Sequence, residues 1–153
     1  MRHLLLLFCV LFAAAAADEQ EAKALPDGAG KSTVVKACLD CHGAANFRKV
    51  RKDADEWNES VQDMVDRGAK AEGPEMKEIV AYLVTNFGKD AKVRINTAPL
   101  EEIKVVLGFT VPEAKAVVDY RERNGAYKEW RDLLKAPGVD AAKVEAKKDV
   151  MAF

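Results

Sequence analysis

The chain is poor in the side chains that build disulfides and metal cages. Its 153 residues include only three cysteines and two histidines. A zinc site with four Cys or His ligands would use four of these five residues, which makes such a site improbable. The charge is nearly balanced, with 24 Lys and Arg against 25 Asp and Glu, so it offers little of the attraction that dominates nucleic-acid affinity. We also find no spacing typical of a catalytic triad, a metal-carboxylate cluster or a phosphate-binding P-loop.

The N-terminus has the pattern of a secretory signal peptide. A basic start, Met1-Arg2-His3, precedes an apolar run from Leu4 to Phe12, and Ala15-Ala16-Ala17 stands before Asp18. That run is shorter than the ~20 residues that span a bilayer, and small residues follow it as at a cleavage site. We therefore expect residues 1–17 to be removed, with no transmembrane anchor after cleavage and a periplasmic or otherwise extracytoplasmic location.

After removal of residues 1–17 the chain keeps two cysteines and one histidine, and these three lie within five residues of one another. Cys38-Leu39-Asp40-Cys41-His42 forms C-x-x-C-H, the attachment sequence of a c-type haem. Both thiols can bind one haem covalently while His42 reaches the iron from the proximal side. A thioredoxin-like redox pair does not need the histidine. The motif thus predicts one covalent haem c and leaves no cysteine for a disulfide.

The first part of the mature chain, residues 18–92, shows a helical pattern. A short helix is expected from Gly30 to Cys38. Apolar residues at helical spacing mark a second helix from Trp57 to Val65 and a third from Met76 to Phe87. Arg67 to Pro74 should be a loop between them.

These features together resemble a small class I cytochrome c domain over residues 28–88. The resemblance implies a methionine before the last helix as the distal iron ligand, and Met64, ahead of the Gly68 loop, fits better than Met76. Trp57 is expected to contact the haem edge. The chain departs from the family because no proline lies between His42 and Trp57.

The second part, residues 93–153, is also expected to be helical. Leu100, Ile103 and Leu107 mark a helix that closes at Gly108, and a capping box from Thr110 to Glu113 starts another that ends at Gly125. The pattern then repeats in degenerate form, with a helix around Trp130 to Leu134, a turn at Pro137-Gly138, and a helix from Asp140 onward.

Residues 93–153 resemble the tandem helix-hairpin-helix domain of bacterial competence DNA-uptake proteins. The resemblance carries through Arg94-Ile95-Asn96-Thr97-Ala98 and Leu133-Leu134-Lys135-Ala136-Pro137-Gly138. It implies phosphate contact by the backbone at Gly108 and Gly138. The usual Gly-x-Gly turn lacks its second glycine in both hairpins, where Thr110 and Asp140 stand instead. Residues 93–153 also hold 11 basic and 10 acidic residues, a nearly neutral balance. We therefore favour a docking module over a DNA-binding one.

The sequence predicts an all-α protein with a signal peptide (1–17), a cytochrome c haem domain (18–92) and a helix-hairpin-helix domain (93–153). The expected function is single-electron transport by a secreted monohaem cytochrome, an electron carrier and not an enzyme, with redox proteins as partners. Two alternatives stay open. One is a DNA-binding helix-hairpin-helix protein with an attached redox haem, and the other is a haem enzyme or sensor with an open distal site.

Overall fold

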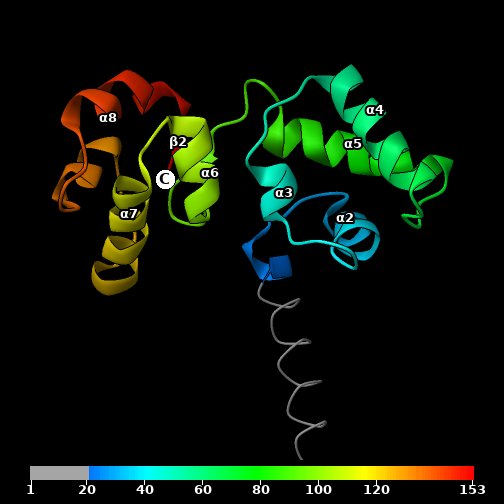
Figure 1. Ribbon diagram of the computed structural model, residues 1–153, viewed down its shortest axis with the longest axis horizontal. Helices are drawn as coiled ribbons and strands as arrows, with labels where there is room; N and C mark the ends of the chain where they lie inside the picture. Colours follow the sequence, from blue (N-terminus) through cyan, green and yellow to red (C-terminus); the bar gives the residue numbers. More distant parts are fainter. Residues whose placement is uncertain (1–20) are drawn as a thin grey trace, which may run out of the picture.

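The computed structural model describes residues 21–153, which form two groups of helices placed side by side (Figure 1). The predicted signal peptide lies outside the described residues. One group holds residues up to about 92, here called the first part, and the other holds residues 93–153, the second part. No helix within residues 21–153 has both the length and the apolar content needed to cross a membrane. The predominantly helical class is confirmed.

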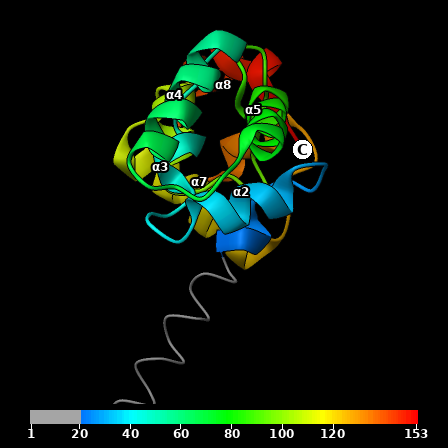
Figure 2. The same ribbon diagram turned by 90° about the vertical axis from the view of Figure 1, so that its right-hand side faces the viewer.

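Residues 31–92 of the first part hold four helices, and local capping bonds mark the starts of the two longest. They are α2 (Lys31–Cys38), α3 (Ala45–Arg48), α4 (Ala54–Asp66) and α5 (Gly73–Phe87). Asp53 caps α4, because its side chain accepts the Glu56 N–H while the Glu56 carboxylate accepts the Asp53 N–H. Figure 2 shows α4 and α5 packed side by side, with α2 crossing at one end.

Aromatic side chains fill the core between these helices. Trp57 is 3% exposed, and its indole N–H donates to the Phe87 carbonyl at 3.2 Å. Phe87 packs edge-on against Phe47 and Tyr82, and the Tyr82 hydroxyl donates to the Pro26 carbonyl. Each polar tip thus has a partner while its ring adds apolar area to a small core.

The second part has its own core and is closed by a short parallel strand pair. Its elements are β1 (Val93–Arg94), α6 (Leu100–Leu107), α7 (Val111–Asn124), the 3₁₀ helices η1 (Trp130–Lys135) and η2 (Lys148–Val150), α8 (Ala141–Lys147) and β2 (Met151–Ala152). Val93 pairs with Met151 and Arg94 with Ala152. The core cluster draws on residues from Val93 to Met151 and is separate from the cluster of the first part.

Four details differ from the sequence expectations. The segment at Trp130–Lys135 is a 3₁₀ helix rather than an α-helix, α3 was not expected, and α5 begins at Gly73, inside the expected loop. The strands were also missed, because two residues are too few to show an alternating pattern. The long helices agree: α4, α5, α6 and α7 lie where their apolar periodicity places them.

A buried ion cluster joins the two parts. Arg48 of α3 donates to the Glu102 carboxylate of α6 at 2.9 Å, and Arg51 donates to its other oxygen at 2.8 Å. The side chains of Arg48 and Glu102 are only 2% and 3% exposed. Arg48 also donates to the carbonyls of Ala24 and Thr97, so its guanidinium is satisfied from both parts.

Candidate functional site

The first helical hairpin turns at Gly108, between α6 and α7. Gly108 adopts φ 71° and ψ 26°, a left-handed conformation that side chains with a Cβ rarely take. Phe109 follows it into the core at 3% exposure. Thr110 then caps α7, with its hydroxyl oxygen accepting the Glu113 N–H.

The second hairpin repeats this geometry between η1 and α8. Gly138 has φ 81°, and Asp140 caps α8 by accepting the N–H groups of Ala142 at 2.7 Å and Lys143 at 3.4 Å. Both glycines singled out from the sequence therefore lie in left-handed turns that lead into a capped helix. A Cβ added at either would meet nothing within 4 Å.

One carboxylate links the two hairpins. Glu113 accepts the Thr110 N–H and hydroxyl, each at 2.7 Å, from the first hairpin. From the second it accepts the Asp140 N–H at 3.3 Å and the Lys143 ammonium at 2.7 Å. These donors, Lys143 first and then Thr110, lower the pKa of Glu113 to about 2.

The sequence signalled only part of this arrangement. Its capping box identified the bonds between Thr110 and Glu113, which are local. The bonds from Glu113 to Asp140 and Lys143 span 27 and 30 residues, so they depend on how the two hairpins pack and no local motif announces them.

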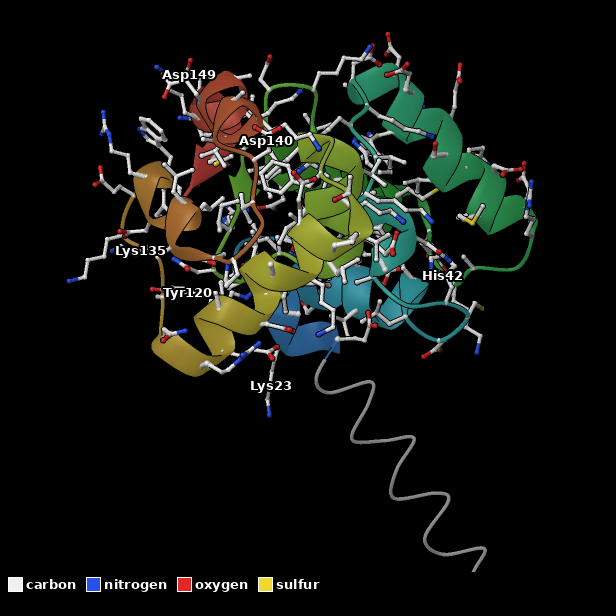
Figure 3. The ribbon with its side chains drawn as sticks, turned by 60° about the vertical axis from the view of Figure 1, so that its left-hand side comes forward. Lys23, His42, Tyr120, Lys135, Asp140 and Asp149 are labelled. Atoms are coloured by element: carbon white, nitrogen blue, oxygen red, sulfur yellow. The ribbon has the colours of Figure 1, made fainter. Side chains whose placement is uncertain are left out.

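Most other cations of the second part are paired on its surface. Lys115 and Arg123 both contact Asp119 on the exposed side of α7, and Lys135 contacts Asp132. Lys135 and Asp140 both lie on this half of the molecule (Figure 3). Such exposed pairs exchange readily with solvent, so these lysines and arginines are available to an incoming anion at small cost.

A cavity of about 470 Å³ lies in the first part, between α2, α4 and α5, within the size range of ligand pockets. Its lining includes four residues singled out from the sequence: Cys38, His42, Trp57 and Met64. Cys41 and Met76 are not among the lining residues; Cys41 is exposed and Met76 packs against the core of the first part.

The cavity carries donors suited to a covalently held haem. His42 Nδ1 lies 3.3 Å from the Gly43 carbonyl, an arrangement that holds an imidazole ring and leaves Nε2 for a metal. The ring contacts Phe47 edge-on, with centroids 6.4 Å apart. Burial, and after it the neighbouring Cys41, raises the pKa of the Cys38 thiol to about 11. His42 and Met64, a nitrogen and a thioether donor, share one apolar-walled space, so the residues fit the group.

The two sites lie apart. His42 is in the first part and Asp140 in the second, on separate sides of the view in Figure 3. Among residues 21–153, no group of three or more His, Cys, Asp or Glu residues is arranged to hold a metal ion by itself.

Comparison with known proteins concerns the second part. The family model of the helix-hairpin-helix motif matches residues 88–151. ComE operon protein 1 of Bacillus subtilis (strain 168) is 42% identical over 52 residues, which are 34% of this chain and 25% of that protein. Endonuclease/exonuclease/phosphatase family domain-containing protein 1 of Homo sapiens is 41% identical over 54 residues, 35% of this chain and 10% of that protein.

A third relative is an uncharacterized protein of Haemophilus influenzae, 36% identical over 63 residues, 40% of this chain and 56% of that protein. The chain thus spans about a quarter of the Bacillus relative and about half of the Haemophilus one. No solved structure matches the chain.

These matches correct the expected class. The description of the chain as an electron-transport cytochrome is wrong: the family model found is the helix-hairpin-helix motif, the Bacillus relative is a ComE operon protein, and neither lends support to haem or redox partners. They favour the DNA-binding alternative. The class I cytochrome c fold of residues 28–88 stays a prediction. The comparisons, with the two hairpins described above, establish that the chain contains a helix-hairpin-helix domain over residues 88–151.

Proposed function

We propose that this chain binds the phosphate backbone of DNA through its tandem helix-hairpin-helix domain. The observation that carries the proposal is the pair of left-handed turns at Gly108 and Gly138, each leading into a capped helix. Backbone N–H groups at such turns can point at a phosphate, and a glycine allows close approach. The match to the ComE operon protein and the resemblance to competence DNA-uptake proteins support the same conclusion.

The contacts proposed are with phosphates and not with bases. Turn N–H groups carry no sequence information, so binding should depend on salt and little on sequence. With 11 basic and 10 acidic residues in the second part, we expect wild-type affinity in the ~10⁻⁴–10⁻⁶ M range typical of non-specific binding at physiological salt. The docking role expected from the charge balance is the competing interpretation.

Titration of the full chain with a fluorescent DNA duplex over a salt series tests the proposal. Gly108→Ala and Gly138→Ala together should weaken binding, because a Cβ strains the left-handed backbone of each turn and so displaces its N–H groups. Gly125→Ala is the matched control: Gly125 also has a left-handed φ of 89° and open space around it, but it ends α7 at the opposite end from the turn. Equal affinities for all three proteins would contradict the proposal.

A second proposal concerns the cofactor and is supported by the residues that line the cavity of the first part. We propose that one haem c is attached through Cys38 and Cys41, with His42 as the proximal and Met64 as the distal iron ligand. The shared cavity of Cys38, His42 and Met64 supports three members of this set, Cys41 rests on the motif alone, and Trp57 would lie against the haem edge. The haem would supply a redox-active iron. Its attachment agrees with the proposed extracytoplasmic location and requires no catalytic role for the chain.

Intact mass and haem-peroxidase staining after denaturing electrophoresis test the attachment. A mass equal to the unmodified chain, after expression with a haem-attachment system, would refute it. For the distal ligand, Met64→Ala should abolish the near-infrared sulfur-to-iron absorption band of the ferric protein, and Met76→Ala should retain it. The reverse result would assign Met76.

A further inference from the structure

The Glu113 carboxylate lies where the two hairpins converge. It accepts one backbone N–H from each hairpin turn, that of Thr110 and that of Asp140, together with the Thr110 hydroxyl. These two residues stand at the positions that would be the second glycine of each turn. Two backbone N–H groups of the turns that we propose to contact phosphate are therefore already bonded to an anion of the chain itself.

We propose that Glu113 acts as an internal substitute for a DNA phosphate, so that DNA must displace its carboxylate to reach the two turns. This inference rests on the proposed DNA binding and adds its regulation. A carboxylate and a phosphate are both anions that accept charge-assisted hydrogen bonds from backbone N–H groups and from lysine. Both should compete for the same donors.

Lys143 is part of the same competition. Its ammonium is 2.7 Å from Glu113 Oε2, and Glu113 is only 7% exposed. The Lys143 side chain is 37% exposed but its partner carboxylate is buried, so the pair exchanges less freely than the exposed pairs of α7. Glu113 therefore withholds from DNA one positive side chain as well as two N–H groups.

The competition should not depend on pH in the physiological range. The groups facing the carboxylate are the Lys143 ammonium and the uncharged donors of Thr110 and Asp140. Because they hold its pKa at about 2, Glu113 stays ionised at neutral pH. Salt and DNA concentration, not protons, would set how often it is displaced.

Replacement of the charge gives a direct test in the full chain. Glu113→Gln removes the competing charge and frees Lys143 for one further phosphate contact. One added contact steepens the slope of log K against log salt by about 0.9, and so raises affinity about tenfold at ~50 mM salt. Asp119→Asn is the matched control, because it removes one negative charge from the same helix at an exposed pair with Lys115, away from the turns.

A second pair of variants identifies Lys143 as the group released. Lys143→Met should change DNA affinity less than twofold in the wild-type background, where the ammonium is occupied. In the Glu113→Gln background it should abolish most of the gain. Equal affinity for Glu113→Gln and Asp119→Asn would overturn the inference. So would a loss from Lys143→Met that is the same in both backgrounds.

Folding controls distinguish a loss of DNA binding from a loss of structure. Circular dichroism and thermal unfolding establish that each variant is folded. If Glu113→Gln does not fold, Glu113→Asp, whose carboxylate is one methylene shorter and cannot reach both turns, should give a smaller gain, and no gain would overturn the inference. If every protein binds DNA equally, the inference alone fails. If none binds at ~50 mM salt, the proposed DNA binding fails, and the inference with it.

Discussion

Glu102 is a buried side chain of the second part that contacts the first part. It is almost fully buried and neutralises two guanidinium groups, those of Arg48 and Arg51. Removing one partner of a buried ion cluster leaves charge uncompensated, at a cost of roughly 3–5 kcal/mol. We therefore expect Glu102→Ala to lower the free energy of unfolding by about this amount in urea denaturation.

Its neighbour Glu101 provides the control for that measurement. Glu101 pairs with Lys104 on the surface and its side chain is 45% exposed. Exposed pairs of this kind contribute roughly 0–1 kcal/mol, so Glu101→Ala should change stability little. Similar losses in the two variants would mean that the buried cluster adds no stability beyond a surface pair.

The lowered pKa of Glu113 predicts that the stability of the chain depends on pH. That pKa falls from 4.5 to about 2 in the folded chain, so the ionised form favours folding above about pH 4.5 and this contribution is lost as the pH falls toward 2. The stability difference between wild type and Glu113→Gln, from urea unfolding at several pH values, should be constant near neutrality and shrink across that window. A difference that does not vary with pH would contradict the assignment.

The residues that the sequence singled out are those with a local signal, and their roles stay predictions. The C-x-x-C-H spacing indicated Cys38 and His42, and the turn pattern indicated Gly108 and Gly138. Glu102 and Glu113 were not found as linking residues, because their partners lie 51 or 54 and 27 or 30 residues away. An acidic residue in a helix is usually exposed, and only the packing of neighbouring elements makes these two exceptional.

At the scale of elements, the turn between α6 and α7 should be sensitive to a single methyl group. Gly108→Ala places a Cβ in a left-handed backbone, which costs about 1–2 kcal/mol; nothing lies within 4 Å to add a clash. Gly73→Ala, at the first residue of α5, has equally open space and no positive φ. The new Cβ there meets only the ring of the following Pro74, so a loss of thermal midpoint clearly smaller than that of Gly108→Ala would establish that the left-handed backbone decides.

The sequence pattern predicted the long helices but not α3 or the 3₁₀ form of η1. α4 and α7 each span more than three turns, enough for a repeating pattern and a capping box to agree. α3 has four residues and η1 has six, and a pattern that short does not distinguish an α-helix from a 3₁₀ helix. The tertiary surroundings of these segments therefore determine their form.

For the whole molecule, the two separate cores predict that the second part folds by itself. Its cluster runs from Val93 to Met151 and includes no residue of the first part. Residues 93–153 alone should be helical by circular dichroism and unfold in one cooperative transition, with Glu102 exposed in place of its buried contacts. A non-cooperative unfolding curve would indicate that the first part is needed to complete the fold.

The sequence indicated the division into two parts. From the sequence we expected an electron carrier and placed DNA binding second, whereas the comparisons favour DNA binding. A short motif dominated the interpretation, because C-x-x-C-H is specific and the charge balance opposed DNA binding. The comparisons favour the hairpins instead. The near-neutral charge does not by itself oppose the proposed DNA binding, because several cations lie in exposed pairs, as Lys115 and Arg123 do with Asp119, and stay available to phosphate.

The parallel pairing of β1 with β2 brings Val93 beside Met151 and Arg94 beside Ala152. The second part thus enters and leaves its fold at one point, the condition under which circular permutation and insertion into a host protein succeed. A short linker from residue 153 to residue 93 would close the backbone into a ring, and new ends could be cut in the exposed segment at Gly125. A helix-hairpin-helix module of this shape could be placed within a surface loop of an unrelated carrier without pulling its hairpins apart.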